Sequence, residues 1–276
     1  MSFKYESVAG HFEHDNASEP LVAVPDRFGL KDSSDQRWQN LFKHIHALNQ
    51  EAPDNTFYKI FLLSRHGQGY HNLAEAKYGT KAWDEHWSKL DTDGELLWGP
   101  DPLLTPLGRE QGGDIRAVWK KEALVGLPPP HKRYCSPLAR ALDTCDIMLD
   151  QVFDAHPHPV LIIENCREEN GVHTCDKRQT RSYIADYKPH FSFEEDFSEH
   201  DELWHPTIRE TKPEVARRAQ AVLDRVFEKD TEDIFISITA HSGWINGFLT
   251  AIGREHFRLP TGGVMPVLMK ASLKCE

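Results

Sequence analysis

The chain has 276 residues, of which 39% are hydrophobic and 27% are charged. This balance suits a folded domain with a buried core and excludes a disordered chain. Its 43 Asp and Glu residues against 32 Lys and Arg residues give a formal net charge of −11. That charge repels polyanions, so we expect no nucleic-acid partner, whereas a small anion can still bind in a locally basic pocket.

Cysteine content and hydropathy indicate the compartment. The number of cysteines is odd and none forms a CxxC pair, so we expect free thiols in a reducing compartment at Cys135, Cys145, Cys166, Cys175 and Cys275. The N-terminal segment lacks the apolar stretch of a secretory signal, and no apolar run reaches membrane-spanning length. We therefore expect a cytoplasmic or nucleocytoplasmic protein without a membrane partner. The sequence carries no signal for an oligomeric state.

The first half of the chain predicts a flank followed by a buried strand. Residues 1–56, with a helix expected at 35–50, are interpreted as an N-terminal flank of a single domain that spans 1–276. The segment FYKIFLLS at 57–64 is nearly continuously apolar, which is typical of a central strand buried on both faces. A helical pattern follows at 105–124.

The second half alternates strands with helices. Strands are expected at 133–135, 160–163 and 234–240, and helices at 138–149, where the preceding Ser136-Pro137 favours a start, and at 213–228. This alternation predicts an α/β fold, a three-layer sandwich with a mainly parallel central sheet flanked by helices. The core is expected at about 57–252.

Two stretches fit the predicted core poorly. Residues 79–104 and 189–212 are aromatic, acidic and contain proline. We interpret them as surface excursions, and long excursions often serve as active-site lids. For Trp83, Trp87 and Trp98 in the first excursion, core packing and a lid role are equally supported.

Reactive residues follow three of the predicted strands. Arg65-His66, Ser136 and His241 all lie at carboxyl ends of strands, where α/β folds collect their chemistry. A histidine there can attack phosphorus if its other ring nitrogen is fixed and cations neutralise the phosphoryl oxygens. Arginine suits that second task, because its planar fork matches phosphate geometry.

Two neighbours of these residues add to the hypothesis. Gly67 would let the backbone approach a substrate closely. Arg140, in the helix after Ser136, either brings a second guanidinium to the phosphate or lies on a solvated helix face.

The order of these motifs resembles a known family. RHGQGYHN after a strand, LTPLGREQ, SPLARALDT after a strand and AHSG after the last strand are similar to the histidine phosphatase, or phosphoglycerate mutase-like, superfamily. The segment ENCREENGVHTCDKR at 164–178 resembles the fungal branch of phosphomutase-like proteins, whose members tend to act as phosphatases. The resemblance covers about 57–252 and implies a phosphoglycerate mutase-like sandwich.

The resemblance also implies roles for individual residues. His66 corresponds to the nucleophile that becomes phosphohistidine, and Arg65, Arg140 and His241 to the rest of the catalytic phosphate pocket. The residues expected to bind substrate beside them are Asn72, Gln68, Gly67, Ser242 and His173.

The proton donor of the family falls in the segment CREENG at 166–171. Cys166 stands where the family has leucine, and the distance from Glu168 to Gly171 is one residue shorter than in the mutases. Glu168 and Glu169 therefore both remain candidates, and we prefer Glu168. It would protonate the leaving alkoxide and then accept a proton from the attacking water. Fixed cations neutralise the phosphate, so we expect neither a metal nor a cofactor.

Three other features have alternative interpretations. His156 and His158 are either a pair of metal ligands or, as we prefer, part of a proline-rich turn. The pair His173-x-Cys175 is expected to shape the pocket. The basic cluster at 177–181 is either a solvated loop or a substrate contact.

The sequence thus favours a metal-independent phosphatase that hydrolyses small soluble phosphate esters through phosphohistidine on His66. The alternatives are a phosphoglycerate-type phosphomutase, whose substrate-gripping segment is not recognisable here, and a non-catalytic subunit of a larger assembly. A scaffold would not need the intact catalytic set. The identity of the phosphorylated substrate is not encoded in any recognisable motif.

Overall fold

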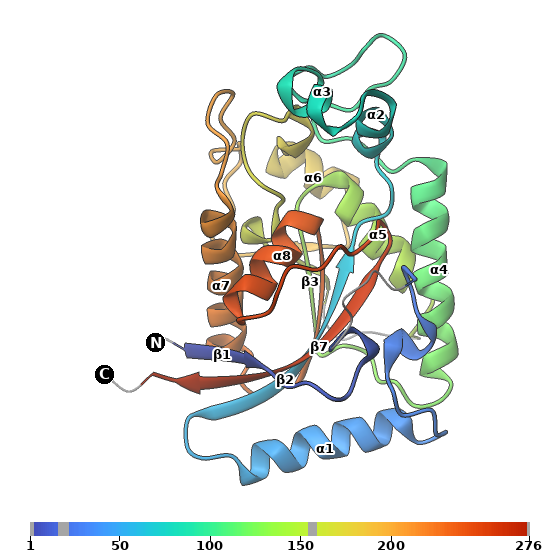
Figure 1. The fold of residues 1–276 in the computed structure, drawn as a ribbon, viewed down its shortest axis with the longest axis vertical. Helices are drawn as coiled ribbons and strands as arrows, with labels where there is room; N and C mark the ends of the chain where they lie inside the picture. Colours follow the sequence, from blue (N-terminus) through green and yellow to red (C-terminus); the bar gives the residue numbers. More distant parts are fainter. Residues whose placement is uncertain (1–2, 16–21, 154–158, 275–276) are drawn as a thin grey trace.

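The computed structural model describes residues 3–15, 22–153 and 159–274, and Figure 1 shows a central sheet with helices packed around it. The strands in the described residues are β1 Phe3–Ser7, β2 Thr56–Arg65, β3 Lys132–Cys135, β4 Leu161–Ile162, β5 Ser192–Phe193, β6 Phe235–Ala240 and β7 Val264–Leu273. The α-helices are α1 Arg37–Glu51, α2 Tyr70–Tyr78, α3 Thr80–Glu85, α4 Pro106–Ala123, α5 Ala139–Leu149, α6 Arg181–Tyr187, α7 Lys212–Lys229 and α8 Ser242–Ala251. None of these helices is both long and apolar enough to span a bilayer.

All of these strands belong to one sheet, in the order β1-β7-β2-β6-β3-β4-β5. Five neighbouring strands run parallel to one another, namely β2, β6, β3, β4 and β5. In contrast, β7 pairs antiparallel with both β2 and β1. The predicted α/β sandwich with a mainly parallel sheet is therefore confirmed.

Apolar side chains on both faces of the sheet build two cores. Phe61 and Leu63 of β2 face α7 and α8, while Ile60 and Leu62 face α1, α4 and α5. A strand covered on both faces is apolar at most positions, which is why 57–64 shows no alternation. Figure 1 shows α7 and α4 on opposite sides of the sheet.

The two longest helices among the described residues begin at threonines that cap them. Thr105 caps α4 by accepting a hydrogen bond from the N–H of Gly108, with Pro106 as the first helical residue. Thr211 and Glu214 form a capping box at the start of α7.

The ends of the chain contribute strands that the sequence analysis did not identify. β7 lies between β2 and β1, although Pro266 in its sequence argues against a central strand. The register between β1 and β7 explains how the strand tolerates this proline. β1 pairs only with Met269–Leu273, so at Pro266 the strand has a neighbour on one side only.

The first excursion folds over the carboxyl ends of the parallel strands. Figure 1 shows α2 and α3 at that end of the molecule. Trp83 and Trp98 are buried there with Ala74 and Cys175 in a small apolar cluster of their own, and Trp87 packs against it. The tryptophans thus pack together, but in a cluster separate from the two main cores.

Candidate active site

Three strand ends meet at one edge of the sheet. β6 lies between β2 and β3, so Arg65 at the end of β2, His241 after β6 and Ser136 after β3 are neighbours. A cavity of about 350 Å³ opens at this edge, between α2, α8 and the segment around 168–176. The predicted site residues that line it are Arg65, His66, Asn72, Arg140, Glu168, His173 and Ser242.

His66 is buried at the base of this cavity, with 2% of its surface exposed. Its Nδ1 lies 2.7 Å from the backbone oxygen of Gly67. A carbonyl can only accept, so Nδ1 carries the proton and Nε2 keeps its lone pair. Burial and the nearby guanidinium groups of Arg140 and Arg65 hold the pKa of His66 well below its usual value. The imidazole is therefore neutral and can act as a nucleophile.

His241 lies beside His66, although it is not among the residues that line the cavity. The two ring centroids are 5.0 Å apart, and His241 is fully buried. Its Nε2 is 2.7 Å from the hydroxyl oxygen of Ser136. Its Nδ1 has no hydrogen-bond partner among the described residues. Burial and the guanidinium of Arg140 lower the pKa of His241 well below its usual value, so this ring is neutral too.

Arg140 is buried, which excludes the solvated helix face. Its guanidinium donates to the backbone oxygen of Cys175 at 2.7 Å and to Oδ1 of Asp176 at 2.9 Å. The helix that carries it begins at Ala139, whose N–H donates to Asp101. Arg65 is anchored from the other side, through a hydrogen bond from Nη1 to the backbone oxygen of Leu259 at 2.8 Å.

The two candidate acids differ in their partners. The carboxylate of Glu168 accepts hydrogen bonds from the N–H groups of Gly243, at 3.0 Å, and Glu169, at 3.1 Å. Burial, with the charges of Asp176 and Glu169, raises the pKa of Glu168. The carboxylate of Glu169 instead forms ion pairs with Lys212 and, at 3.7 Å, with Arg209. Of the two, Glu168 therefore fits the expected proton donor better.

Gly67 and Gln68 do not line the cavity. A side chain at Gly67 would clash with the backbone of Gly108, because an added Cβ would lie 2.2 Å from the Gly108 oxygen. Helix packing, rather than close approach to a substrate, therefore requires this glycine. The side-chain oxygen of Gln68 accepts a hydrogen bond from the hydroxyl of Thr105 at 2.8 Å.

Asn72 both lines the cavity and holds the loop before α2. Its Oδ1 accepts a hydrogen bond from the N–H of Gly69 at 3.0 Å. Its amide nitrogen remains to donate into the cavity.

The basic cluster at 177–181 lies outside the cavity lining, which gives no support to substrate contact. It is not simply solvated either. Arg178 is buried and bonds the carboxylate of Glu164, while Lys177 and Arg181 lie over the rings of Trp204 and Phe193. These contacts tie the 164–181 segment to the second excursion.

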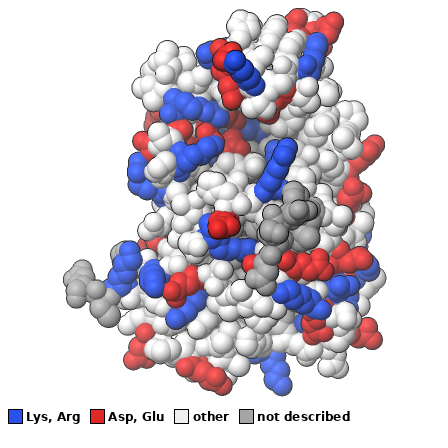
Figure 2. Space-filling view, viewed as in Figure 1, with Lys and Arg blue, Asp and Glu red and all other residues white. Residues whose placement is uncertain are grey.

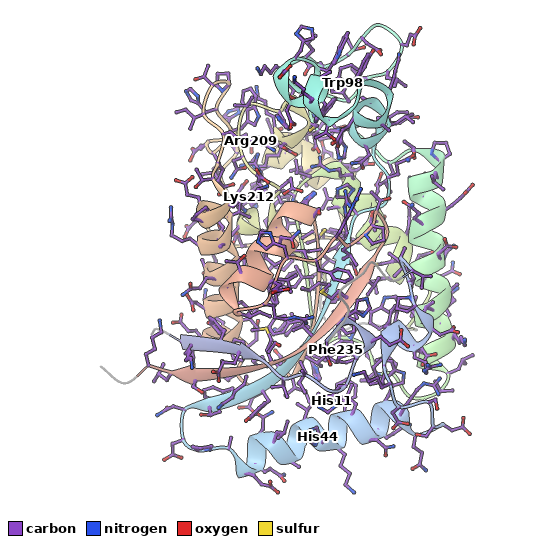
Figure 3. The ribbon with its side chains drawn as sticks, in the orientation of Figure 1. His11, His44, Trp98, Arg209, Lys212 and Phe235 are labelled. Atoms are coloured by element: carbon purple, nitrogen blue, oxygen red, sulfur yellow. The ribbon has the colours of Figure 1, made fainter. Side chains whose placement is uncertain are left out.

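Sequence reasoning missed several charged or polar residues of the cavity. Among them are His71, Asp176, Arg209 and Lys212. Both excursions approach the site, since Trp83 and Asp84 of the first and Arg209 and Lys212 of the second line it. Figure 3 labels Arg209 and Lys212 where α7 begins, on the side towards α2 and α3. Aromatic and acidic composition signalled the excursions, but no local pattern signalled these individual residues.

His173, Cys175 and Asp176 are close enough together to hold a metal ion, with potential ligand atoms within 4.8 Å of one another. The hydrogen bonds of Asp176 and the protonation of Cys175 oppose the binding of a metal ion. Both carboxylate oxygens of Asp176 accept from guanidinium groups, those of Arg140 and Arg209, each at 2.9 Å. Burial raises the pKa of the Cys175 thiol well above its usual value, which disfavours a thiolate ligand. The trio therefore does not fit a resident metal.

The expectations for the His156–His158 pair and for the five cysteines involve residues outside the described part of the chain. His156 and His158 lie outside the described residues. Four of the five cysteines are buried free thiols, and Cys275 lies outside the described residues.

Comparison with known proteins agrees with this geometry. A family model described as the histidine phosphatase superfamily (branch 1) matches residues 61–261. A protein of Arthroderma benhamiae named "Probable phosphoglycerate mutase" is 37% identical, covering 96% of this chain and 84% of its own length. Phosphomutase-like protein 3 of Candida albicans is 32% identical, covering 96% of this chain and 80% of its own.

Among solved structures, the ecdysone phosphate phosphatase from Bombix mori, in complex with tungstate, shares the fold. The TM-score is 0.50 at 15% identity, over 75% of this chain and 88% of the other. The matched family model covers the strand ends that carry Arg65, His66, Ser136 and His241. The chain belongs to the histidine phosphatase superfamily.

Proposed function

We propose that the protein is a metal-independent phosphatase that hydrolyses small phosphate esters through phosphohistidine on His66. The orientation of the His66 ring carries this proposal. Its Nδ1 is held on the oxygen of Gly67, which leaves the Nε2 lone pair for attack in a cavity that also contains Arg65 and Arg140.

The transfer to His66 follows from the surrounding charges. Nε2 attacks phosphorus in line with the departing ester oxygen, so the N–P bond forms as the P–O bond breaks. Arg65 and Arg140 neutralise the phosphoryl oxygens, and the amide of Asn72 donates to them. The unpartnered Nδ1 of His241 beside His66 supplies a further contact when Ser136 donates to Nε2.

Glu168 supplies the proton in this scheme. As a carboxylic acid it protonates the leaving alkoxide, and as a carboxylate it then takes a proton from the water that attacks phosphohistidine. Its backbone hydrogen bonds fix its position, and its raised pKa favours the acid form at the start of the cycle.

The cavity favours a small substrate. A volume of about 350 Å³ accommodates a phosphate and a modest polar leaving group. In the view of Figure 2, basic and acidic side chains alternate over the described surface, and neither sign covers it continuously. Together with the net charge of −11, this supports a small soluble ester rather than a nucleic acid or a membrane surface. We place the activity in the cytoplasm.

A phosphoglycerate-type mutase is the alternative that the names of the fungal relatives suggest. Such an enzyme needs cations free to grip the substrate carboxylate. The extra cations here, Arg209 and Lys212, are paired with Asp176 and Glu169. That pairing supports the phosphatase.

A screen of phosphate esters for released inorganic phosphate, with and without excess chelator, tests the proposal. We expect release in both conditions, because arginines perform the neutralisation that a metal would otherwise perform. Rapid quenching with labelled substrate should trap an acid-labile, base-stable adduct in the wild type and none in His66→Ala. Loss of activity on chelation that a divalent ion restores, or an isomerised ester as the main product, would contradict it.

A further inference from the structure

We propose that His71 is a further catalytic residue, whose Nε2–H donates a hydrogen bond to an oxygen of the transferring phosphoryl group. The inference rests on the proposed function. It adds a donor that none of the assigned residues supplies.

His71 lies beside the nucleophile. It is the second residue of α2, lines the cavity and has 8% of its surface exposed. Its ring centroid is 5.4 Å from that of His66. Arg65 and Arg140 line the same cavity, so a phosphoryl group on His66 would come within reach of all three side chains.

The ring edge that faces the cavity follows from its surroundings. The edge that carries Nδ1 lies against Gly69, where an added Cβ would be 2.7 Å from Nδ1 and 2.8 Å from Cε1. Nδ1 is buried there without a hydrogen-bond partner among the described residues. The opposite edge, with Nε2, is the one left to face the cavity.

The position of the proton follows from what each ring nitrogen can reach. A proton on Nδ1 would leave a buried N–H without an acceptor among the described residues and would turn the Nε2 lone pair towards the negative phosphoryl oxygens. A proton on Nε2 directs the N–H into the cavity, where a phosphoryl oxygen or water can accept it. Burial, followed by the charge of Arg140, lowers the pKa of His71 well below its usual value, so the ring is a neutral donor.

The loop that carries His71 is fixed before substrate arrives. The N–H of Gly69 donates to Asn72, and the N–H of Tyr70 donates to the backbone oxygen of Leu103 at 3.2 Å. Gly69 is required because any side chain there would displace the imidazole. A donor held in place in this way stabilises charge without reorganising during the reaction.

Two substitutions separate a donor from a packing role. His71→Phe keeps an aromatic ring without the N–H, and His71→Gln places an amide nitrogen near the position of Nε2. The exposed His200, outside the cavity lining, gives the matched control His200→Phe. Each variant is tested as the full chain for inorganic phosphate binding by calorimetry, for single-turnover phosphorylation of His66 by p-nitrophenyl phosphate, and for thermal unfolding.

We expect His71→Phe to weaken phosphate binding and to lower the single-turnover rate by about 10²-fold, the usual cost of losing one fixed donor. His71→Gln should recover at least a tenth of the wild-type rate, and His200→Phe should match the wild type. Long-range proton–nitrogen NMR of the wild type should show His71 protonated on Nε2.

Several outcomes overturn the inference. They are wild-type phosphate affinity and rate in His71→Phe, equal losses in folded Phe and Gln variants, or a proton on Nδ1. If His71→Phe fails to fold, His71→Leu takes its place in the same comparison. If the wild type releases no phosphate, the proposed function fails, whereas phosphate calorimetry and the NMR spectrum still decide the role of His71.

Discussion

The carboxylate of Glu168 accepts a hydrogen bond from the N–H of Gly243 at 3.0 Å, at the start of α8. The contact is so close that a Cβ on Gly243 would lie 2.0 Å from Oε1 of Glu168. Gly243 therefore helps to position the carboxylate of the proposed proton donor, although it lies two residues after His241. The N–H of Gly243, which is free because it lies in the first turn of α8, orients the carboxylate of Glu168. The same close contact leaves no room for a side chain at position 243.

Gly243→Ala should displace Glu168 without unfolding the protein. A misplacement of about 1 Å can cost 10²-fold in rate, and we expect a loss of that order on an alkyl phosphate. Hydrolysis rates and urea unfolding of the two proteins check this expectation.

Gly113→Ala is the matched control, because Gly113 also lies in a helix but an added Cβ there meets nothing within 4 Å. Alanine should stabilise that helix by about 0.5–1 kcal/mol and leave the activity unchanged. A Gly243→Ala protein with full activity would mean that Glu168 adapts freely or is not the acid.

Substitution of the two glutamates decides which one is the proton donor. An alkyl alkoxide needs protonation in the transition state, whereas p-nitrophenolate barely does. Glu168→Gln should therefore cost about 10²–10⁴-fold on alkyl phosphates and much less in phosphorylation of His66 by p-nitrophenyl phosphate. Single-turnover measurements are needed, since the same carboxylate also assists the later attack by water.

Glu169→Gln should show no such dependence on the leaving group, because Glu169 is engaged by Lys212 and Arg209. An exchange of behaviour between the two variants would make Glu169 the acid. If neither variant depends on the leaving group, the donor lies outside this segment.

The pH dependence should follow the opposite shifts of the nucleophile and the acid. Burial and two guanidinium groups lower the pKa of His66 well below 6.5, so the neutral nucleophile is lost only when the pH falls below that lowered pKa. Burial raises the pKa of Glu168 above 4.5, so the acid form is lost as the pH rises through that raised pKa. For an alkyl phosphate, kcat/KM should rise as the pH climbs through the lowered pKa of His66 and fall as it passes the raised pKa of Glu168.

Glu168→Gln supplies the control for this profile. The second ionisation of a phosphate monoester, near pH 6, affects both proteins equally. The part of the alkaline decline that disappears in Glu168→Gln therefore belongs to Glu168. An unchanged profile in the variant would remove Glu168 from the acid step.

The sequence predicted the strand ends better than the cavity wall. β2 and β6 are largely apolar runs, and β2, β3 and β6 all end at distinctive motifs, so both the strands and the reactive residues after them could be located. β7 could not, because Pro266 counts against a strand until the register with β1 is known. The N-terminal flank likewise gave no sign that Phe3–Ser7 would join the sheet.

Arg209 shows why the rest of the site could not be predicted. It reaches the cavity because the second excursion packs against the acid segment, with the N–H of Glu210 bonded to the oxygen of Asn170 at 2.9 Å. Gly171, at φ +84°, permits this approach, since a Cβ there would lie 1.8 Å from the oxygen of Ile208. Such contacts between distant loops depend on the assembled fold and leave no local pattern.

A buried ion pair between Arg37 and Glu122 joins α1 to α4 and contributes to stability. Glu122 of α4 is fully buried and accepts hydrogen bonds from Arg37 Nε at 2.7 Å and Trp38 Nε1 at 2.9 Å, both on α1. Glu122→Ala leaves the Arg37 charge buried and unpaired, so we expect a loss of about 3–5 kcal/mol in the free energy of unfolding. The exposed pair of Arg116 and Asp150 provides the control, and Arg116→Ala should cost less than about 1 kcal/mol.

A double substitution distinguishes the charge from the packing. Arg37→Met together with Glu122→Leu removes both charges and keeps most of the apolar volume, so it should be more stable than Glu122→Ala alone. Urea unfolding followed by tryptophan fluorescence compares the three proteins with the wild type. If the double variant is as unstable as Glu122→Ala, lost packing between α1 and α4, rather than the uncompensated charge of Arg37, causes the loss.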